Sequence, residues 1–230
     1  MKLFDPLPRK KGTSLAEFSH YWMTHHAELV KEFRRITRYV QSVRLEHKPR
    51  VLGPPLGETW CDGCAETWHA DGSSADEMAR EPLFPELMDD EIRFIDRAHP
   101  RYLLKTEERL LDEHEFDPRL RGVKVLLFVR RSPSVTRREF TTAWTDDAGA
   151  TSSRRLGATR HVVCSAVGQV ESMSAEDGYD GVRELWWPSM PALEEGLARE
   201  PRAAAALLRP DTIDVARSFA LVARERVNVP

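Results

Sequence analysis

The sequence "EFSHYW" at residues 17–22 returns as "EFTTAW" at residues 139–144, and this repeat decides the fold. Further along the chain, "CDGCAETW" (61–68) returns as "YDGVRELW" (179–186) with Asp, Gly, Glu and Trp in register. Several matches in one order and at nearly constant spacing indicate an internal repeat. We therefore predict that the chain is a tandem duplication.

Both copies show the order strand, helix, strand, strand, helix, strand. In the second copy the β-branched run "VKVLLFV" is typical of a buried strand, and an Ala- and Leu-rich stretch is typical of a helix. The predicted strands of this copy are 123–129, 160–167, 181–187 and 218–225, with a late helix at about 190–208. The predicted later strands of the first copy are 37–46, 64–69 and 100–108.

The start of each first helix is marked by a capping box. Ser14 is followed three residues later by Glu17, and Thr136 is followed in the same way by Glu139. In this motif the hydroxyl and the carboxylate each accept a hydrogen bond from a backbone N–H that the helix leaves unpaired. Both first helices are therefore predicted to begin at these positions.

The first strand of the first copy departs from the pattern. The stretch "KLFDPLP" places Pro6 and Pro8 where a central strand would donate hydrogen bonds. We therefore expect this strand to be short and to end near Asp5.

The predicted fold class is α+β, with tandem ferredoxin-like βαββαβ domains forming a pseudo-dimeric α+β barrel. The polar stretch "DEHEFDPRLR" at 112–121 separates the copies. The expected domains are residues 1–115 and residues 120–230. Two such sheets can cover each other's open faces, as the subunits of a dimer would.

Composition excludes several classes of partner. The net charge of −3 gives no electrostatic reason to expect nucleic acid or an anionic membrane. No apolar run approaches the roughly 20 residues that span a bilayer, and the N-terminus lacks the apolar core of a secretory signal. Three cysteines are too few for a disulfide framework. We expect a cytoplasmic protein whose partner is a small hydrophobic molecule.

The stretches "EFSHYWMTHHAELV" (17–30), "CDGCAETW", "YDGVRELWW" and "RFID" (93–96) resemble the EthD family. The resemblance implies a dimeric α+β barrel. Similar members include small cofactor-free enzymes, among them dehydratases and decarboxylases, that act on aromatic or polyketide-like intermediates. Others are accessory proteins in oxidative degradation. In EthD-like sequences a histidine recurs four residues after the tryptophan, which is His26 here, whereas the second copy has Ala148. The resemblance thus implies that residues 1–115 are the active copy and residues 120–230 a scaffold.

Helical periodicity leaves two histidines as candidates. One stripe of the first helix is apolar and should face its own sheet, and it consists of Leu15, Phe18, Trp22, Leu29, Phe33 and Ile36. His25 and His26 lie on opposite shoulders of that stripe, and periodicity does not choose between them. The resemblance favours His26. His20 and Tyr21 are expected to point into solvent.

An imidazole in an aromatic cleft can transfer a proton near neutral pH. The expected site therefore has His26 as its acid or base, with His25, Trp22, Tyr39 and Trp68 as substrate-binding residues. Glu66 is a second catalytic candidate, because a lone carboxylate in the middle of a covered strand is costly. Its equivalent in the second copy, Glu184, has no histidine nearby, which favours a structural role.

Cofactor sites are not predicted. Cys61 and Cys64 have metal-ligand spacing, but the second copy has Tyr179 and Val182 there, and no second pair completes a four-cysteine site. No phosphate-binding glycine-rich loop appears. We therefore expect no metal and no nucleotide cofactor.

The leading hypothesis is a cofactor-independent lyase or isomerase acting on a small aromatic or cyclic carbonyl compound. Dehydration, decarboxylation or rearrangement would be its outcome. Two alternatives stay open: an oxidoreductase of the cofactor-free or haem monooxygenase type, and a non-catalytic ligand-binding accessory protein. A homodimer of the pseudo-dimeric chain is also left open.

Overall fold

The computed structural model describes residues 1–47, 49, 56–69, 75–99, 103–115, 122–146, 148–169, 178–209 and 211–229. The first half of the chain consists of β1 (Lys2–Leu7), α1 (Leu15–Tyr21), a π-helix η1 (Trp22–His26), α2 (Ala27–Lys31), β2 (Ile36–Arg44), β3 (Gly63–His69), α3 (Ala75–Met78), α4 (Phe84–Phe94) and β4 (Leu104–Glu113). The second half consists of β5 (Val123–Val129), α5 (Arg137–Trp144), α6 (Ala148–Arg155), β6 (Arg160–Gln169), β7 (Gly181–Trp187), α7 (Met190–Arg199), α8 (Pro201–Leu208), a 3₁₀ turn η4 (Val215–Arg217) and β8 (Phe219–Val229).

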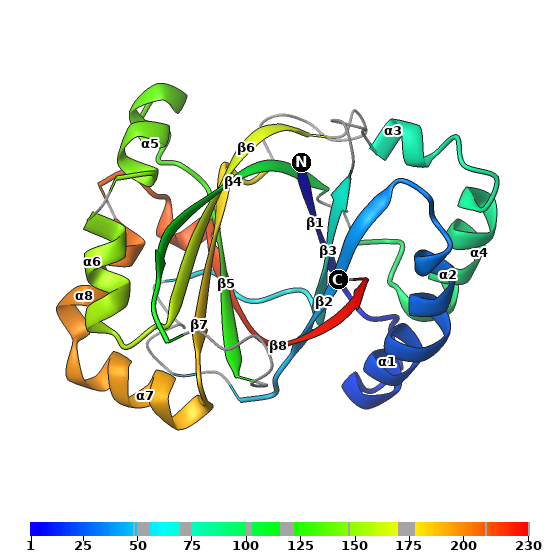
Figure 1. Cartoon of the computed structure of the whole chain (residues 1–230), viewed down its shortest axis with the longest axis horizontal. Helices are drawn as coiled ribbons and strands as arrows, with labels where there is room; N and C mark the ends of the chain where they lie inside the picture. The colour runs from blue at the N-terminus through cyan, green and yellow to red at the C-terminus, as the bar shows by residue number, and fades with distance from the viewer. Residues whose placement is uncertain are drawn as a thin grey trace.

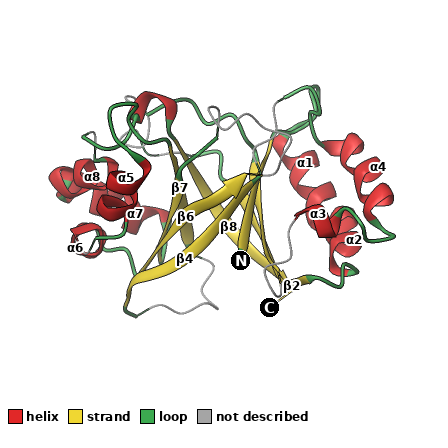
Figure 2. Cartoon of the chain, turned by 90° about the horizontal axis from the view of Figure 1, so that it is seen from above, coloured by secondary structure: helices red, strands yellow, loops and turns green. Residues whose placement is uncertain are grey.

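The strands form one closed antiparallel barrel in the order β1-β3-β2-β8-β5-β7-β6-β4. Each half contributes four neighbouring strands, and the halves are joined by the pairs β2–β8 and β4–β6. In each half the order of the strands is the same, so the two joining pairs are equivalent. The helices of the two halves flank the barrel on opposite sides (Figures 1 and 2). The predicted α+β barrel of two ferredoxin-like units is confirmed.

Local signals placed the first helices correctly. Ser14 and Thr136 each accept a hydrogen bond from the backbone N–H of the glutamate three residues on, and both capping boxes are complete. The predicted late helix at 190–208 is interrupted: α7 ends before Glu200, and Pro201 begins α8. This break follows from proline, which cannot continue the hydrogen-bond ladder of a preceding helix.

The prediction that the first strand ends near Asp5 is wrong. β1 continues to Leu7, and Pro6 pairs with Cys64 of β3. β1 pairs with β4 only over Lys2–Phe4. Beyond Phe4, the edge of β1 that faces away from β3 has no neighbouring strand among the described residues, so no backbone N–H is needed on that edge. Pro6 is tolerated because its missing N–H falls on that part of the strand. The start of the predicted strand 100–108 and the proposed domain boundary near 115–120 lie largely outside the described residues.

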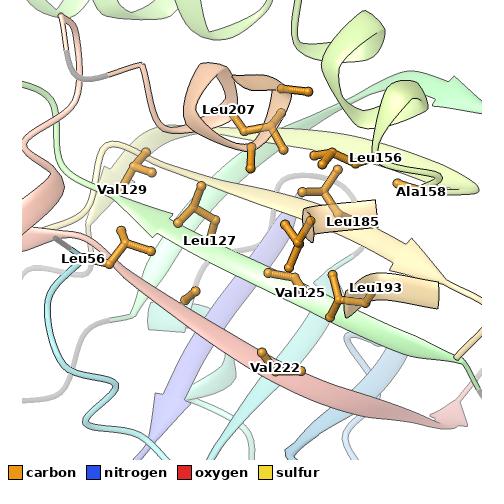
Figure 3. Packing of buried hydrophobic residues seen from close by; sticks show 14 of the residues in the cluster. Leu56, Val125, Leu127, Val129, Leu156, Ala158, Leu185, Leu193, Leu207 and Val222 are labelled. Carbon is orange, nitrogen blue, oxygen red and sulfur yellow. The ribbon is translucent and has the colours of Figure 1, made fainter. Parts of the chain in front are cut away.

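Apolar side chains occupy the barrel interior and the layers beneath the helices. The interior cluster joins residues of both halves, among them Phe4, Phe128 and Phe219. Beneath the helices of the second half lies a large continuous core, drawn in Figure 3, that includes Leu127, Leu185 and Leu207. In the first half the corresponding layer is divided into two smaller clusters. The second half is therefore the more fully packed of the two.

The barrel interior also holds four buried charges from equivalent positions of the two halves. Lys2 and Lys124 lie on the first strand of each half, and Glu66 and Glu184 lie on the third. Each lysine contacts both glutamates, with N···O distances of 2.5 to 2.8 Å. Buried charges are stable only when they are paired in this way. Burial favours the neutral form of Glu184, but the two ammonium groups outweigh that effect and lower its pKa to about 2.

Among the described residues, every helix is too short or too polar to cross a membrane.

Candidate active site

A cavity of about 610 Å³ lies in the first half, between the outer face of its sheet and its helices. Its apolar walls come from every layer of this half. They include Val30, Phe33, Ile36, Tyr39, Ala65, Phe84 and Leu87. This volume falls in the range of pockets that bind small molecules. The polar side chains that line it are therefore the candidates for chemistry.

His26 lines this cavity and is 5% exposed. It is the last residue of the π-helix η1, in which the N–H of Ala27 donates to the carbonyl of Trp22, five residues back. The wider turn rotates His25 away from the buried stripe and leaves His26 beneath the helix. His26 then packs against Phe94, with 4.8 Å between ring centroids. His25 is exposed and stacks on Tyr21.

A carboxylate holds the ring of His26. Its Nδ1 lies 2.8 Å from Oδ2 of Asp90, on α4. The other oxygen of Asp90 accepts a hydrogen bond of 2.5 Å from the hydroxyl of Tyr21. A carboxylate that accepts from Nδ1–H leaves the lone pair of a neutral imidazole on Nε2 and makes that nitrogen more basic. Tyr21, Asp90 and His26 thus form a chain that can orient a proton-transfer group.

The expectation that Tyr21 points into solvent is wrong, because its ring packs on Phe94 and its hydroxyl reaches Asp90. The helix α4 covers this flank of α1, which the sequence of α1 alone does not reveal. Burial, followed by the bond to Asp90, raises the pKa of Tyr21. His20 is exposed, as expected.

The expected aromatic walls are only partly assembled. Tyr39 lines the cavity, and its hydroxyl accepts a hydrogen bond of 2.9 Å from Gln41. Trp22 is fully buried and packs against Gly63, where a Cβ would come within 2.4 Å of the indole. Trp144 and Gly181 make the same contact in the second half. This packing explains why Trp and Gly recur in both copies, and it keeps Trp22 out of the cavity lining.

Glu66 and Trp68 lie on the other face of β3. Strand residues alternate between faces, and Ala65, Thr67 and His69 line the cavity on the outer face. Glu66 points into the barrel and joins Lys2 and Lys124. Trp68 stacks over the ammonium group of Lys2 at 4.3 Å. The structure therefore does not bring Glu66 or Trp68 to His26.

Sequence reasoning missed Asp90, which is 64 residues from His26. No local pattern signals a contact between α4 and η1, so only the packing of the two helices reveals it. Sequence reasoning also left His69 without a role. This residue is 4% exposed, lines the cavity and has its Nε2 2.8 Å from the hydroxyl of Thr67.

The corresponding space in the second half is filled. Arg183 is fully buried there, with its guanidinium 4.1 Å from the ring centroid of Trp144. It donates to Nε2 of His161 at 3.0 Å. Burial lowers the pKa of His161 to about 3, and the charge of Arg183 adds to that effect. His161 is therefore neutral near pH 7, with Nδ1–H directed to the hydroxyl of Ser153.

Only one group of acidic or thiol side chains among the described residues is close enough together to hold a metal ion: Glu108, Cys164 and Glu184. Glu184 is already paired with Lys2 and Lys124. Burial raises the pKa of the Cys164 thiol, which disfavours the thiolate that binds metals. These residues thus suit an ion-pair cluster better than a metal centre.

Three solved structures share the fold across nearly the whole chain. An anthrone oxidase-like protein superposes with a TM-score of 0.65 at 11% identity, covering 100% of this chain and 93% of that one. A candidate monooxygenase from Fusobacterium nucleatum subsp. nucleatum gives 0.54 at 7% identity, covering 98% and 90%. Another from Lactobacillus acidophilus gives 0.52 at 10% identity, covering 99% and 93%. These likenesses show the fold alone.

No curated protein matches the sequence of this chain. A family model matches part of the chain. That part contains His26, Asp90 and most of the residues that line the cavity. Residues 10–98 match the EthD domain.

Proposed function

We propose that this protein is a cofactor-independent enzyme that removes a proton from a small aromatic or cyclic carbonyl compound bound in the cavity. The observation that carries the proposal is the Nδ1–Asp90 contact of His26 at 2.8 Å, beside a cavity whose lining is mostly apolar. With Nδ1 held by the carboxylate, proton transfer would go through Nε2. The first half is the active copy. In the second half Ala148 stands at the position of His26, and the side chain of Arg183 fills the space that corresponds to the cavity.

Removal of a proton beside a carbonyl gives an enolate, which can expel a β-hydroxyl group as water or take the proton back at another atom. In a β-keto acid the loss of carbon dioxide gives the enolate directly, and protonated His26 then supplies the proton that this enolate takes up. These outcomes correspond to a lyase or an isomerase. His26, once protonated, is the acid that completes the reaction.

The experiment needs no knowledge of the natural substrate. The α-protons of α-tetralone, a cyclic aromatic ketone, exchange with D₂O when a base removes them, and NMR measures the rate. We expect the protein to accelerate this exchange. His26→Ala should slow it by about 10²–10⁴-fold, while exposed His20→Ala should leave it unchanged. Exchange by folded His26→Ala at the wild-type rate would overturn the proposal, and binding of α-tetralone without catalysed exchange would favour a ligand-binding protein.

A second candidate function is oxidation, which the names of the similar structures favour. The same deprotonation of anthrone gives an electron-rich carbanion that O₂ can oxidise directly, so that anthrone and one O₂ become anthraquinone and one water. Oxygen consumption with anthrone that depends on His26 would select this candidate over the lyase or isomerase. Proton exchange without oxygen consumption would reject it.

A further inference from the structure

His69 lines the cavity, and one of its two ring nitrogens is unsatisfied. It lies at the end of β3, and its Nε2 is 2.8 Å from the hydroxyl oxygen of Thr67. Its Nδ1 is buried and has no hydrogen-bond partner among the described residues. Buried polar atoms are rarely left unpaired, because they lose their bonds to water and gain nothing in return. A ligand group that enters the cavity is a natural partner.

The equivalent position in the second half is satisfied within the protein. Trp187 stands there, and its indole N–H donates to the carbonyl of Leu156 at 2.9 Å. The two positions correspond because the preceding residues, Trp68 and Trp186, pair with Lys2 and Lys124 in the same register. The unpaired nitrogen therefore belongs to the half of the chain that has the cavity.

We propose that His69 binds a hydroxyl group of the ligand, so that the substrate is a hydroxylated aromatic or cyclic carbonyl compound. The inference rests on the proposed function for the carbonyl and adds a second oxygen substituent. His26 would contact the ligand from η1 and His69 from the end of β3, so the two histidines would bind different parts of one molecule.

The bond between His69 and Thr67 explains why a hydroxyl is the best match. If Thr67 donates to Nε2, then Nδ1 carries the proton and needs an acceptor. If Nε2 donates to Thr67, then Nδ1 is bare and needs a donor. A hydroxyl serves both tautomers, whereas a carbonyl serves one. Burial lowers the pKa of His69, which keeps the ring neutral and both tautomers accessible.

The test compares α-tetralone with its ring-hydroxylated derivatives, a set of positional isomers that place a hydroxyl at different distances from the carbonyl. Isothermal titration calorimetry measures their dissociation constants. We expect at least one hydroxylated isomer to bind the wild-type protein about 5–10-fold more tightly than α-tetralone itself. His69→Phe keeps a flat ring but removes both nitrogens, so it should abolish this preference. His69→Asn keeps a polar atom near the position of Nδ1 and should restore part of it.

The control variant is His47→Phe, since His47 is exposed and remote from the cavity lining. A direct signature comes from ¹⁵N-labelled histidine, because a hydroxyl on Nδ1 shifts the resonance of that nitrogen in the wild-type protein. This measurement holds even if a variant fails to fold. Equal affinity for all the tetralones, with no ¹⁵N shift, would overturn the His69 assignment alone. Failure of every tetralone to bind would overturn the proposed function as well.

Discussion

Ala65 and Arg183 occupy the same position on β3 and β7, and they decide which half of the molecule has a cavity. Ala65 pairs with Asp5 and Gln41 in the first half, and Arg183 pairs with Leu127 and Val163 at the equivalent places in the second. The small side chain of Ala65 leaves the cavity of the first half open. In the second half the side chain of Arg183 fills the equivalent space, and its guanidinium lies over the ring of Trp144. One difference in side-chain size thus separates two halves with the same strand order.

Arg183 should be replaceable by an apolar side chain of similar length. Its guanidinium is buried without a carboxylate contact among the described residues, and burial lowers its pKa to about 9. Because a buried charge is costly, we expect Arg183→Met to match or exceed the wild-type free energy of unfolding in urea. Arg183→Ala should lower it by about 2–4 kcal/mol, because a void remains. Equal losses in both variants would mean that the charge itself stabilises the fold.

Stability should fall in mild acid because of His161. The pKa of His161 is about 3 in the folded protein, against 6.5 for an ordinary histidine, so below pH 6.5 the unfolded chain binds a proton that the native protein does not. The stabilisation is complete above pH 6.5 and is lost as the pH falls towards 3. By pH 4 it should have decreased by a few kcal/mol.

The measurement is urea unfolding at a series of pH values for wild type and His161→Gln. The amide oxygen of glutamine can accept from Arg183 and does not titrate, so the variant should show a shallower pH dependence. The control is His20→Gln, which removes an exposed histidine of the first half and leaves Arg183 and His161 untouched, so it should keep the wild-type slope. Parallel curves for wild type and His161→Gln would refute the prediction.

Asp90 should matter more than Tyr21 for proton transfer. Asp90→Asn can present its amide N–H to His26 and so favour the wrong tautomer, and we expect a loss of about 10²-fold or more in the α-tetralone exchange rate. Tyr21→Phe removes one hydrogen bond to the carboxylate and should cost less than about 10-fold. The rate constants should be compared at saturating ketone with thermal melts as the folding control. A larger effect from Tyr21→Phe would reverse the roles of these two residues.

Glu66 should prove to be structural. It is fully buried on the barrel-interior face, where it pairs with Lys2 and Lys124. Glu66→Gln leaves both lysines with one glutamate fewer and should lower the free energy of unfolding by about 3–5 kcal/mol. Glu225→Gln, at the partly exposed rim of the same cluster, should cost less. Proton exchange per folded molecule should be unchanged in both variants, and a specific loss of rate in folded Glu66→Gln would restore it as a catalytic candidate.

Much of the barrel could be predicted because its signals are local. The strand 123–129 is apolar at every position except Lys124 and is buried along its whole length, and the helix starts at Ser14 and Thr136 depend on a residue only three positions away. The repeat supplied the element order of each half. That the repeat reflects a tandem duplication, and that the domains divide near 115–120, stay predictions.

The amino-acid sequence by itself determined the elements, their order and the presence of a histidine on the first helix, because these depend on neighbours along the chain. Only the tertiary structure decided which histidine faces the cavity, since the π-turn at Trp22–His26 departs from the regular helical period. It also decided that Asp90 orients His26 and that Glu66 turns to the lysines of the barrel. Those contacts join side chains far apart in sequence, so no local pattern encodes them, and only the packing of strands and helices brings them together.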